Sequence, residues 1–106
     1  MENGALFNGN CPIELTLSIV GGKWKWFILF ILYKFETVRY SEIKGKLPHI
    51  ADKTLSQQLK DLETSGIIHR EQYNQIPPKV EYSLTGKGRT LIPMLELMYQ
   101  WGKDNS

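Results

Sequence analysis

The chain has little cysteine and no long apolar run. Cys11 is the only cysteine among 106 residues, which excludes an internal disulfide and indicates a reducing compartment. The longest uninterrupted apolar run, Trp26–Tyr33, has eight residues, far short of the roughly 20 that a membrane-spanning helix needs. Residues 1–10 are polar and rich in Gly and Asn, without the basic and apolar parts of a signal peptide. These absences predict a cytoplasmic protein that does not bind a membrane.

Histidine is also scarce, which argues against an enzyme. The two histidines, His49 and His69, have no acid or nucleophile at a spacing that supports catalysis. Together with Cys11 they match no spacing of metal ligands. We therefore expect no catalytic residue, no metal and no cofactor.

Length and charge indicate one small domain with a cationic segment. At 106 residues and 42% hydrophobic content, the chain can build one modest core but not two. The net charge is only +2, yet residues 23–60 hold eight Lys or Arg against three Asp or Glu, a local charge of +5. Such a segment suits a surface that meets phosphates, although a solvated charged face has the same composition.

The segment 51–84 contains a helix with one apolar and one polar side. Within residues 52–63, Leu55, Leu59 and Leu62 fall at i, i+4 and i+7 and form one apolar stripe. The other side is polar and partly cationic, and its residues are Lys53, Thr54, Ser56, Gln57 and Lys60. Upstream, Ser41 is a candidate N-cap for a short helix that Pro48 ends, so a helix-turn-helix is predicted.

A hairpin is predicted directly after this helix. Gly66 suits a left-handed helix end in which Ile67 folds back onto the apolar stripe. The runs 67–73 and 80–84 have strand character, and a loop with two prolines joins them. The short β-prone run 37–40 can pair at the edge of this hairpin. A polar-faced helix followed by a hairpin is the arrangement of a winged helix.

Further segments surround this motif. Residues 1–10 are expected to form a flexible arm, and residues 11–106 a single winged-helix domain for DNA binding and dimerisation. Pro12 predicts the start of a first helix, and residues 23–35 a central helix that is apolar nearly all round. Thr85 predicts the start of a last helix that runs to about Lys103.

The last helix carries more apolar surface than one small core can cover. Pro93 is expected to kink it. Its broad apolar face consists of Leu91, Met94, Leu95, Met98 and Trp101, with Ile92, Leu97 and Tyr99 outside that face. Because contiguous exposed apolar surface marks association, we predict a homodimer. The predicted fold class is α+β, mostly helical: a winged helix-turn-helix whose extra N- and C-terminal helices form a dimer interface.

Several dispersed motifs carry a resemblance to a known family. In chain order they are Cys11-Pro12-Ile13, Gly22-Lys23-Trp24, Gln58-Leu59-Lys60-Asp61-Leu62-Glu63, Gly66-Ile67-Ile68, His69-Arg70, Pro77-Pro78-Lys79-Val80-Glu81-Tyr82-Ser83-Leu84-Thr85 and Gly88-Arg89. From about Cys11 to Gly102 the chain resembles the HxlR-type winged-helix transcriptional regulators. The resemblance implies a dimeric DNA-binding regulator of bacterial or archaeal type. One position departs from the family: Ala51 stands where Ser is often found before the recognition helix, which makes Asp52 the candidate cap.

The predicted mechanism gives the polar side chains different roles. A homodimer is expected to place two 52–63 helices in successive major grooves of a pseudo-palindromic operator, about 34 Å apart. Gln57 can pair bidentately with adenine, and Lys53 or Lys60 with guanine or with phosphate. Positioning contacts to the DNA backbone are expected from Arg70, Lys79, Lys23, Lys25 and Ser41.

Cys11 is the candidate switch. A thiolate at a helix N-terminus is favoured by the helix dipole, and the thiolate is the reactive form. The resemblance implies that some relatives use a cysteine at this position to sense oxidants or electrophiles. With no second cysteine, oxidation gives a bridge between subunits, a mixed disulfide or a higher oxide. The alternative is a small residue that caps a helix and regulates nothing.

Two other functions fit parts of the pattern. One is a winged-helix module that binds protein rather than DNA, in which case the 52–63 helix should expose more apolar residues. The other is a regulator that senses a small molecule rather than an oxidant, in a pocket between the dimer helices lined by Trp24, Trp26, Tyr99 or Trp101.

Overall fold

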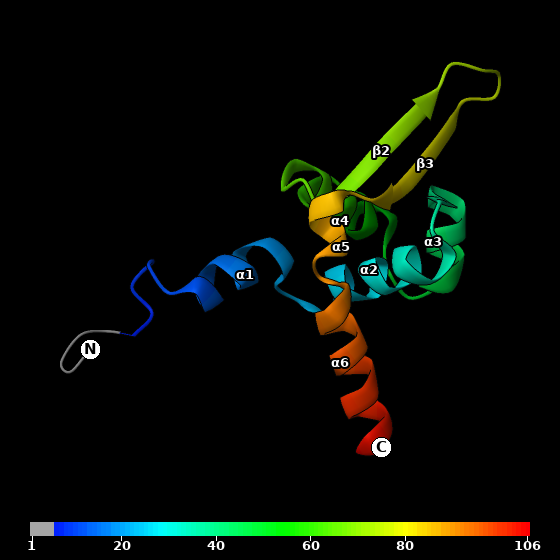
Figure 1. The fold of residues 1–106 in the computed structure, drawn as a ribbon. Coiled ribbons are helices and arrows are strands. Elements are labelled where there is room, and N and C mark those ends of the chain that lie inside the picture. The colour runs from blue at the N-terminus through cyan, green and yellow to red at the C-terminus, as the bar shows by residue number, and fades with distance from the viewer. Residues whose placement is uncertain (1–5) are drawn as a thin grey trace.

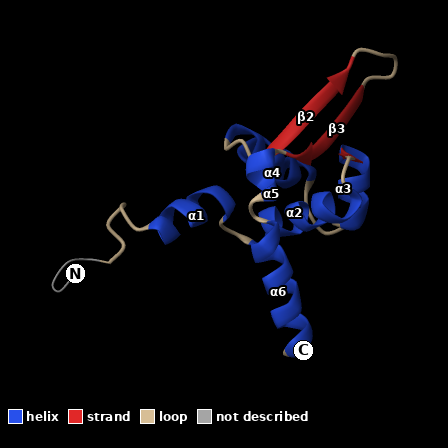
Figure 2. Cartoon of the chain, viewed as in Figure 1, coloured by secondary structure: helices blue, strands red, loops and turns tan. Residues whose placement is uncertain are grey.

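A small antiparallel sheet and six helices make up the part of the chain that the computed structural model describes, residues 6–106 (Figures 1 and 2). The helices are α1 (Pro12–Val20), α2 (Lys23–Phe35), α3 (Tyr40–Lys46), α4 (Asp52–Thr64), α5 (Gly86–Arg89) and α6 (Ile92–Asp104). The strands are β1 (Val38–Arg39), β2 (Ile68–Tyr73) and β3 (Lys79–Leu84), in the sheet order β1-β3-β2. The predicted winged helix-turn-helix of mostly helical α+β class is confirmed.

The core forms around α2. Ile28, Leu29 and Leu32 of this helix are at most 1% exposed, as expected for a helix that is apolar nearly all round. The same cluster contains the buried stripe of α4, Ile68 at the start of β2, Leu84 at the end of β3, and Leu95 of α6. Phe27 lies outside this cluster and remains 45% exposed. Within residues 6–106 no single helix is long and apolar enough to cross a membrane; α1 and α2 pass that test only as a pair bent by 75°.

The turn between α4 and β2 is the helix end that the sequence predicts. Gly66 adopts φ +76°, a left-handed conformation that costs glycine little. The N–H of Ile67 donates to the carbonyl of Leu62 at 2.9 Å, and the N–H of Gly66 to that of Glu63 at 3.0 Å. These two backbone hydrogen bonds are the pattern of a Schellman motif. It directs the chain from α4 straight into the wing.

The wing is the β2–β3 hairpin, with β1 added at its edge. Val38 pairs with Tyr82 of β3, and Arg70 of β2 pairs with the same residue from the other side. The predicted edge pairing of the 37–40 segment is therefore confirmed. In Figure 1 the hairpin extends from the body on the side away from α6.

The C-terminal segment differs from the prediction of one long helix. The Thr85 hydroxyl accepts from the Gly88 N–H at 3.0 Å and so caps only the short α5. The chain then turns, and Pro93 lies at the second position of α6. A proline in the first turn of a helix removes no intrahelical hydrogen bond. Pro93 therefore starts a helix rather than kinking one.

Both predicted caps around the helix-turn-helix are wrong: the N-cap of α3 lies two residues before Ser41, and that of α4 lies one residue before Asp52. α3 begins at Tyr40, not after Ser41, and the Arg39 N–H before it donates to the Glu42 carboxylate at 2.9 Å. α4 has Ala51 at its N-cap with no side-chain bond, so Asp52 is the first helical residue. In both cases a carboxylate inside the first turn favours the helix start through the dipole.

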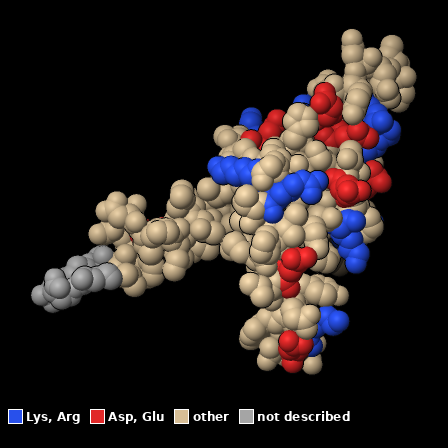
Figure 3. Space-filling view, viewed as in Figure 1, with Lys and Arg blue, Asp and Glu red and all other residues tan. Residues whose placement is uncertain are grey.

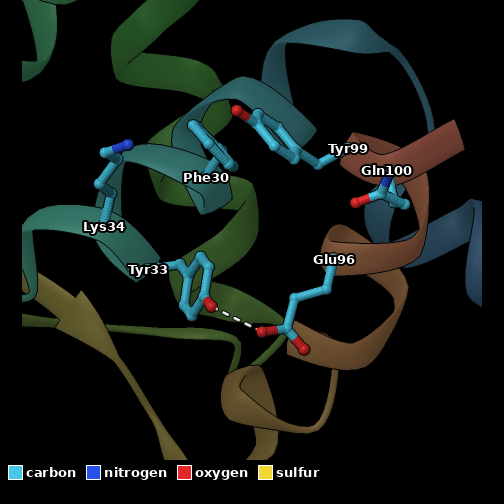
Figure 4. Close-up of a pocket in the computed structure, with 6 residues that line it drawn as sticks. All are labelled: Phe30, Tyr33, Lys34, Glu96, Tyr99 and Gln100. Atoms are coloured by element: carbon cyan, nitrogen blue, oxygen red, sulfur yellow. Dashed lines mark hydrogen bonds between the residues drawn. The ribbon is translucent and has the colours of Figure 1, made fainter. Parts of the chain in front are cut away.

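Two helices project from the body, α1 and α6 (Figure 1). The segment before α1 is tied to it, because the Gly9 N–H donates to both oxygens of Glu14 at 3.0 and 3.1 Å. Residues 1–5 of the predicted flexible arm lie outside the described residues, and the arm remains a prediction. α6 docks on α2 through a Tyr33–Glu96 hydrogen bond of 2.7 Å and stacked rings of Phe30 and Tyr99 (Figure 4).

Candidate nucleic-acid interface

Helix α4 turns one face to the core and the other to solvent. Leu55, Leu59 and Leu62 are 0%, 2% and 0% exposed. The side chains of Lys53, Ser56, Gln57 and Lys60 are exposed, and Thr54 is half-buried at the margin. The structure thus brings together on one solvent-facing surface the polar residues that the sequence singled out. We call Lys53, Ser56, Gln57 and Lys60 the α4 face.

The first turn of α4 is held by α3. The Tyr40 hydroxyl donates to Asp52 Oδ1 at 3.1 Å and lies 3.5 Å from the Ser56 hydroxyl. Lys44 of α3 donates to the Ile50 carbonyl and lies 3.9 Å from Asp52 Oδ1. These contacts between α3, the turn and α4 fix the angle at which the α4 face is presented.

Gln57 is not a free side chain. Its Nε2 donates to Asp61 Oδ1, one turn further along α4, at 2.8 Å. Lys25 approaches the other oxygen, Asp61 Oδ2, at 3.8 Å, and the Lys25 side chain is only 12% exposed. The Lys25 ammonium thus joins α2 to α4, and its predicted phosphate contact remains a prediction.

A shallow groove separates α4 from the wing. It measures about 230 Å³, and its lining residues are Tyr40, Ser56, Lys60, Glu63, Arg70 and Tyr82. Arg70 is exposed on β2 and faces this groove together with Lys60. The wing cation that the sequence proposed is thus next to the α4 face, where both cations can meet one stretch of DNA backbone.

Lys79, the second predicted wing cation, is held by its own hairpin. Its ammonium lies 3.3 Å from Glu81 Oε2 and 4.9 Å from the centre of the Tyr73 ring. Glu81 also hydrogen bonds with the Tyr73 hydroxyl, which is the main reason that the pKa of Glu81 is lowered; Lys79 and Arg39 lower it further. The same hydrogen bond raises the pKa of Tyr73. Lys79 is consequently a poorer candidate for a phosphate contact than the sequence suggested.

Lys23 and Ser41 are the two remaining residues predicted to contact the DNA backbone. Lys23 and Ser41 are exposed, and the Lys23 ammonium lies 4.8 Å from the centre of the Trp24 ring. No structural contact assigns either residue to DNA, so both remain predictions.

Comparisons with known proteins place this geometry in a family. The model of the HxlR-like helix-turn-helix matches residues 19–106. An HTH-type transcriptional regulator of Halalkalibacterium halodurans is 49% identical over 94 residues, 89% of this chain and 83% of that protein. The HTH-type regulator YdzF of Bacillus subtilis is 50% identical over 91 residues, 86% of this chain and 84% of that protein. The solved structure described as the redox regulator HypR in its oxidised form has a TM-score of 0.86 and 46% identity, covering 91% of this chain and 98% of that one.

The chain belongs to the HxlR-like helix-turn-helix family. It is a transcriptional regulator of the helix-turn-helix type, and its relatives are regulators rather than enzymes. This confirms both the resemblance found in the sequence and the expectation that the chain is not an enzyme.

In this HxlR-like regulator the predicted dimer face of α6 is wrong for Leu95 and Leu91 and remains a prediction for its other three residues. Leu95 is 4% exposed and belongs to the chain's own core, and Leu91 packs against that core. Met94, Met98 and Trp101 are 39%, 49% and 70% exposed. Two residues that the sequence placed outside this face, Leu97 and Tyr99, are 71% and 54% exposed.

Helix α1 adds a second exposed apolar surface. Ile13, Leu15 and Leu17 are 58%, 63% and 59% exposed, and Val20 anchors the helix end in the core. In the view of Figure 3 the projecting α1 shows almost no charged atoms, whereas charged side chains of both signs are spread over the body. Its own chain leaves this surface uncovered.

Cys11 precedes α1 and is a half-buried free thiol. Its backbone N–H lies 3.4 Å from Glu14 Oε1. Among residues 6–106 no group of three or more His, Cys, Asp or Glu side chains is arranged to hold a metal ion.

The small-molecule pocket predicted between the dimer helices remains a prediction, but the single chain has two clefts of its own in this region. A cleft of about 400 Å³ lies beneath α6, with Trp26 and Tyr99 in its wall but not Trp24 or Trp101. Phe30 and Tyr99 separate it from a second cleft of about 540 Å³ beside Tyr33 and Glu96 (Figure 4). Sequence periodicity missed Phe30 and Tyr33 as lining residues, because it placed them on a core helix without showing that α6 crosses them.

Proposed function

We propose that this regulator acts as a homodimer that places α4 of each protomer in successive major grooves of a pseudo-palindromic operator. The observation that carries the proposal is the α4 face, whose cationic and hydrogen-bonding side chains are exposed while the opposite leucines are fully buried. A helix of this kind fits the major groove, which is about 12 Å wide. The α4 face has no large apolar side chain, which a protein-binding version of the fold would need.

Charge distinguishes two kinds of contact. Lys53, Lys60 and Arg70 are exposed, and none of the three forms an ion pair with another described residue. They are suited to phosphates, which contribute affinity without reading sequence. Gln57 offers an amide that can read a base edge, with adenine as its best partner.

The dimer rests on α1 and α6. Their exposed apolar residues lie on helices that project from the body, so a second copy can bury both surfaces at once (Figure 1). Contiguous exposed apolar surface on a small protein marks association. A two-fold axis relates the α4 helices of the two protomers, and binding to successive major grooves requires them to lie about 34 Å apart, one turn of DNA.

Cys11 is the proposed switch. It is the only cysteine, it is partly accessible, and it lies at the start of one of the helices proposed to form the dimer. The similar protein HypR is described as a redox regulator. In a homodimer, diamide can take two electrons and two protons from two Cys11 thiols, which leaves an intersubunit disulfide and the reduced hydrazine. Diamide treatment should change the operator affinity of the native protein and leave that of Cys11→Ser unchanged; equal affinity of the native protein before and after treatment refutes the switch.

The salt dependence of DNA binding tests the interface. We expect Lys53→Ala and Lys60→Ala each to reduce the slope of log K against log salt concentration by about 0.9, the value for one lost phosphate contact. Lys79→Ala removes the same charge from a side chain that Glu81 already holds, so its slope should change much less. A slope that falls equally in all three variants shows that net charge, not the α4 face, governs binding.

A further inference from the structure

Asp61 holds two side chains at the edge of the α4 face. Its Oδ1 accepts from Gln57 Nε2 at 2.8 Å, and its Oδ2 lies 3.8 Å from the Lys25 ammonium. Gln57 and Asp61 are one turn apart on α4, whereas Lys25 belongs to α2. The Gln57 amide is therefore connected through Asp61 to the rigid body of the domain.

The carboxylate decides which way this amide points. An ionised carboxylate accepts hydrogen bonds but donates none. Gln57 can therefore turn only its amino group toward Asp61, because the reversed amide would set Oε1 against a carboxylate oxygen. Lys25 restrains the position of the carboxylate, and at 12% exposure its own side chain has little freedom to move elsewhere.

This orientation has a consequence for reading DNA. With one N–H of Nε2 given to Asp61, Gln57 still offers Oε1 as an acceptor and its second N–H as a donor. Adenine presents a matching donor and acceptor, N6 and N7, in the major groove. Guanine presents two acceptors, O6 and N7, so Oε1 finds no donor there.

We propose that Asp61 determines specificity in this regulator without touching DNA: it fixes the polarity of the Gln57 amide, so that α4 prefers adenine over guanine at the position that Gln57 reads. The inference rests on the proposed function, because Gln57 reads a base only if α4 lies in the major groove. Asp61 is thus a positioning residue, and its effect must pass through Gln57.

The test is a binding selection on random duplexes with the full-length native protein, Asp61→Asn and Glu36→Gln. Asparagine can donate as well as accept, so Asp61→Asn permits both orientations of Gln57. We expect the preference for adenine over guanine at one position of each half-site to fall by about tenfold, the order of one bidentate contact. Glu36→Gln removes the same charge from the end of α2, outside the α4 face and its groove, and it should leave that preference unchanged. Lys25→Met should lower the preference in the same direction as Asp61→Asn, by a smaller factor.

The double variant Gln57→Ala with Asp61→Asn separates positioning from a structural role. We expect it to have the same base preference as Gln57→Ala alone, because the side chain on which Asp61 acts is gone. If Asp61→Asn keeps the native preference, or if it lowers affinity for every sequence equally with a lower melting temperature, the inference is overturned and the proposed function stands. If the native protein enriches no sequence at all, the proposed function itself fails, and the inference with it.

Discussion

The hydroxyl of Tyr33 donates a hydrogen bond of 2.7 Å to Glu96, across 63 residues of sequence (Figure 4). It joins α2, the centre of the DNA-binding body, to α6, the helix proposed to form the dimer. Beside it the rings of Phe30 and Tyr99 stack with centroids 5.7 Å apart and planes inclined by 12°. Helix α6 is thus attached to α2 by a polar contact and an aromatic stack, in addition to the burial of Leu95.

The Tyr33–Glu96 bond should give stability a specific dependence on alkaline pH. The bond to Glu96 raises the pKa of Tyr33 above its ordinary value of 10.0, with smaller contributions from burial and from the charge of Glu96. Because the folded-state pKa is the higher one, the stabilisation is complete below pH 10.0 and is lost as pH rises through the raised pKa. The free energy of unfolding, measured with urea at each pH across this range, should fall more steeply with pH for the native protein than for Tyr33→Phe. Equal slopes would show that the bond contributes nothing.

Gly66→Ala should destabilise the fold by about 1–2 kcal/mol, the cost of a left-handed conformation for a residue with a Cβ. The position itself has room, since an added Cβ would meet only the Lys87 side chain, at 3.9 Å. The matched control is Gly45→Ala, in α3, where an added Cβ meets nothing within 4 Å and φ is not positive. That change should stabilise by roughly 0.5–1 kcal/mol, the helix propensity difference. Urea denaturation should show that Gly66→Ala lowers the free energy of unfolding and that Gly45→Ala raises it. A change of the same sign in both variants would contradict the assigned helix end.

The exposed side of α6 should control association. Leu97 is 71% exposed, and Leu97→Glu places a charge in the proposed dimer interface without disturbing the core of the protomer. We expect this variant to be monomeric in sedimentation equilibrium and to bind DNA more weakly because it loses the second half-site. Leu97→Met keeps the apolar surface and should remain dimeric. A dimer of unchanged affinity in Leu97→Glu would locate the interface elsewhere.

The buried side of the same helix should control folding instead. Leu95 is 4% exposed in the common core, so Leu95→Ala should lower the free energy of unfolding by about 2–5 kcal/mol. Thermal melting at a fixed protein concentration measures this effect. A change in the dimer dissociation constant with no change in the unfolding of the protomer would mean that Leu95 faces a partner.

Local sequence patterns were sufficient for the elements whose signals are local. The bounds of α2, the left-handed Gly66 and the two wing strands all follow from periodicity and turn chemistry within a few residues. The stripe of Leu55 and Leu59 even identifies which side of α4 is left for DNA, because one face of an amphipathic helix must be buried. Family resemblance added the function, which these patterns alone do not determine.

The features that were missed depend on contacts between distant segments. Lys25 and Lys79 have the charge of phosphate ligands, but only the structure shows that each lies beside a carboxylate of its own chain, Asp61 and Glu81 respectively. The apolar residues of α6 have the same periodicity on either side of the break after α5, so the sequence could not show which of them face α2. Likewise, Tyr40 contacts Asp52 only because the turn between α3 and α4 brings them together.

The separation of the two α4 helices in solution tests the central claim most directly. A nitroxide can be attached to Gln58→Cys, the half-buried central residue of α4, in a Cys11→Ser background, and the distance between the two labels measured by double electron–electron resonance. The proposed dimer predicts a distribution centred near 34 Å, broadened by the label tethers, that narrows on binding operator DNA. A distance of roughly half that spacing, with the α4 faces packed against each other, or no dipolar signal at all, would contradict the account.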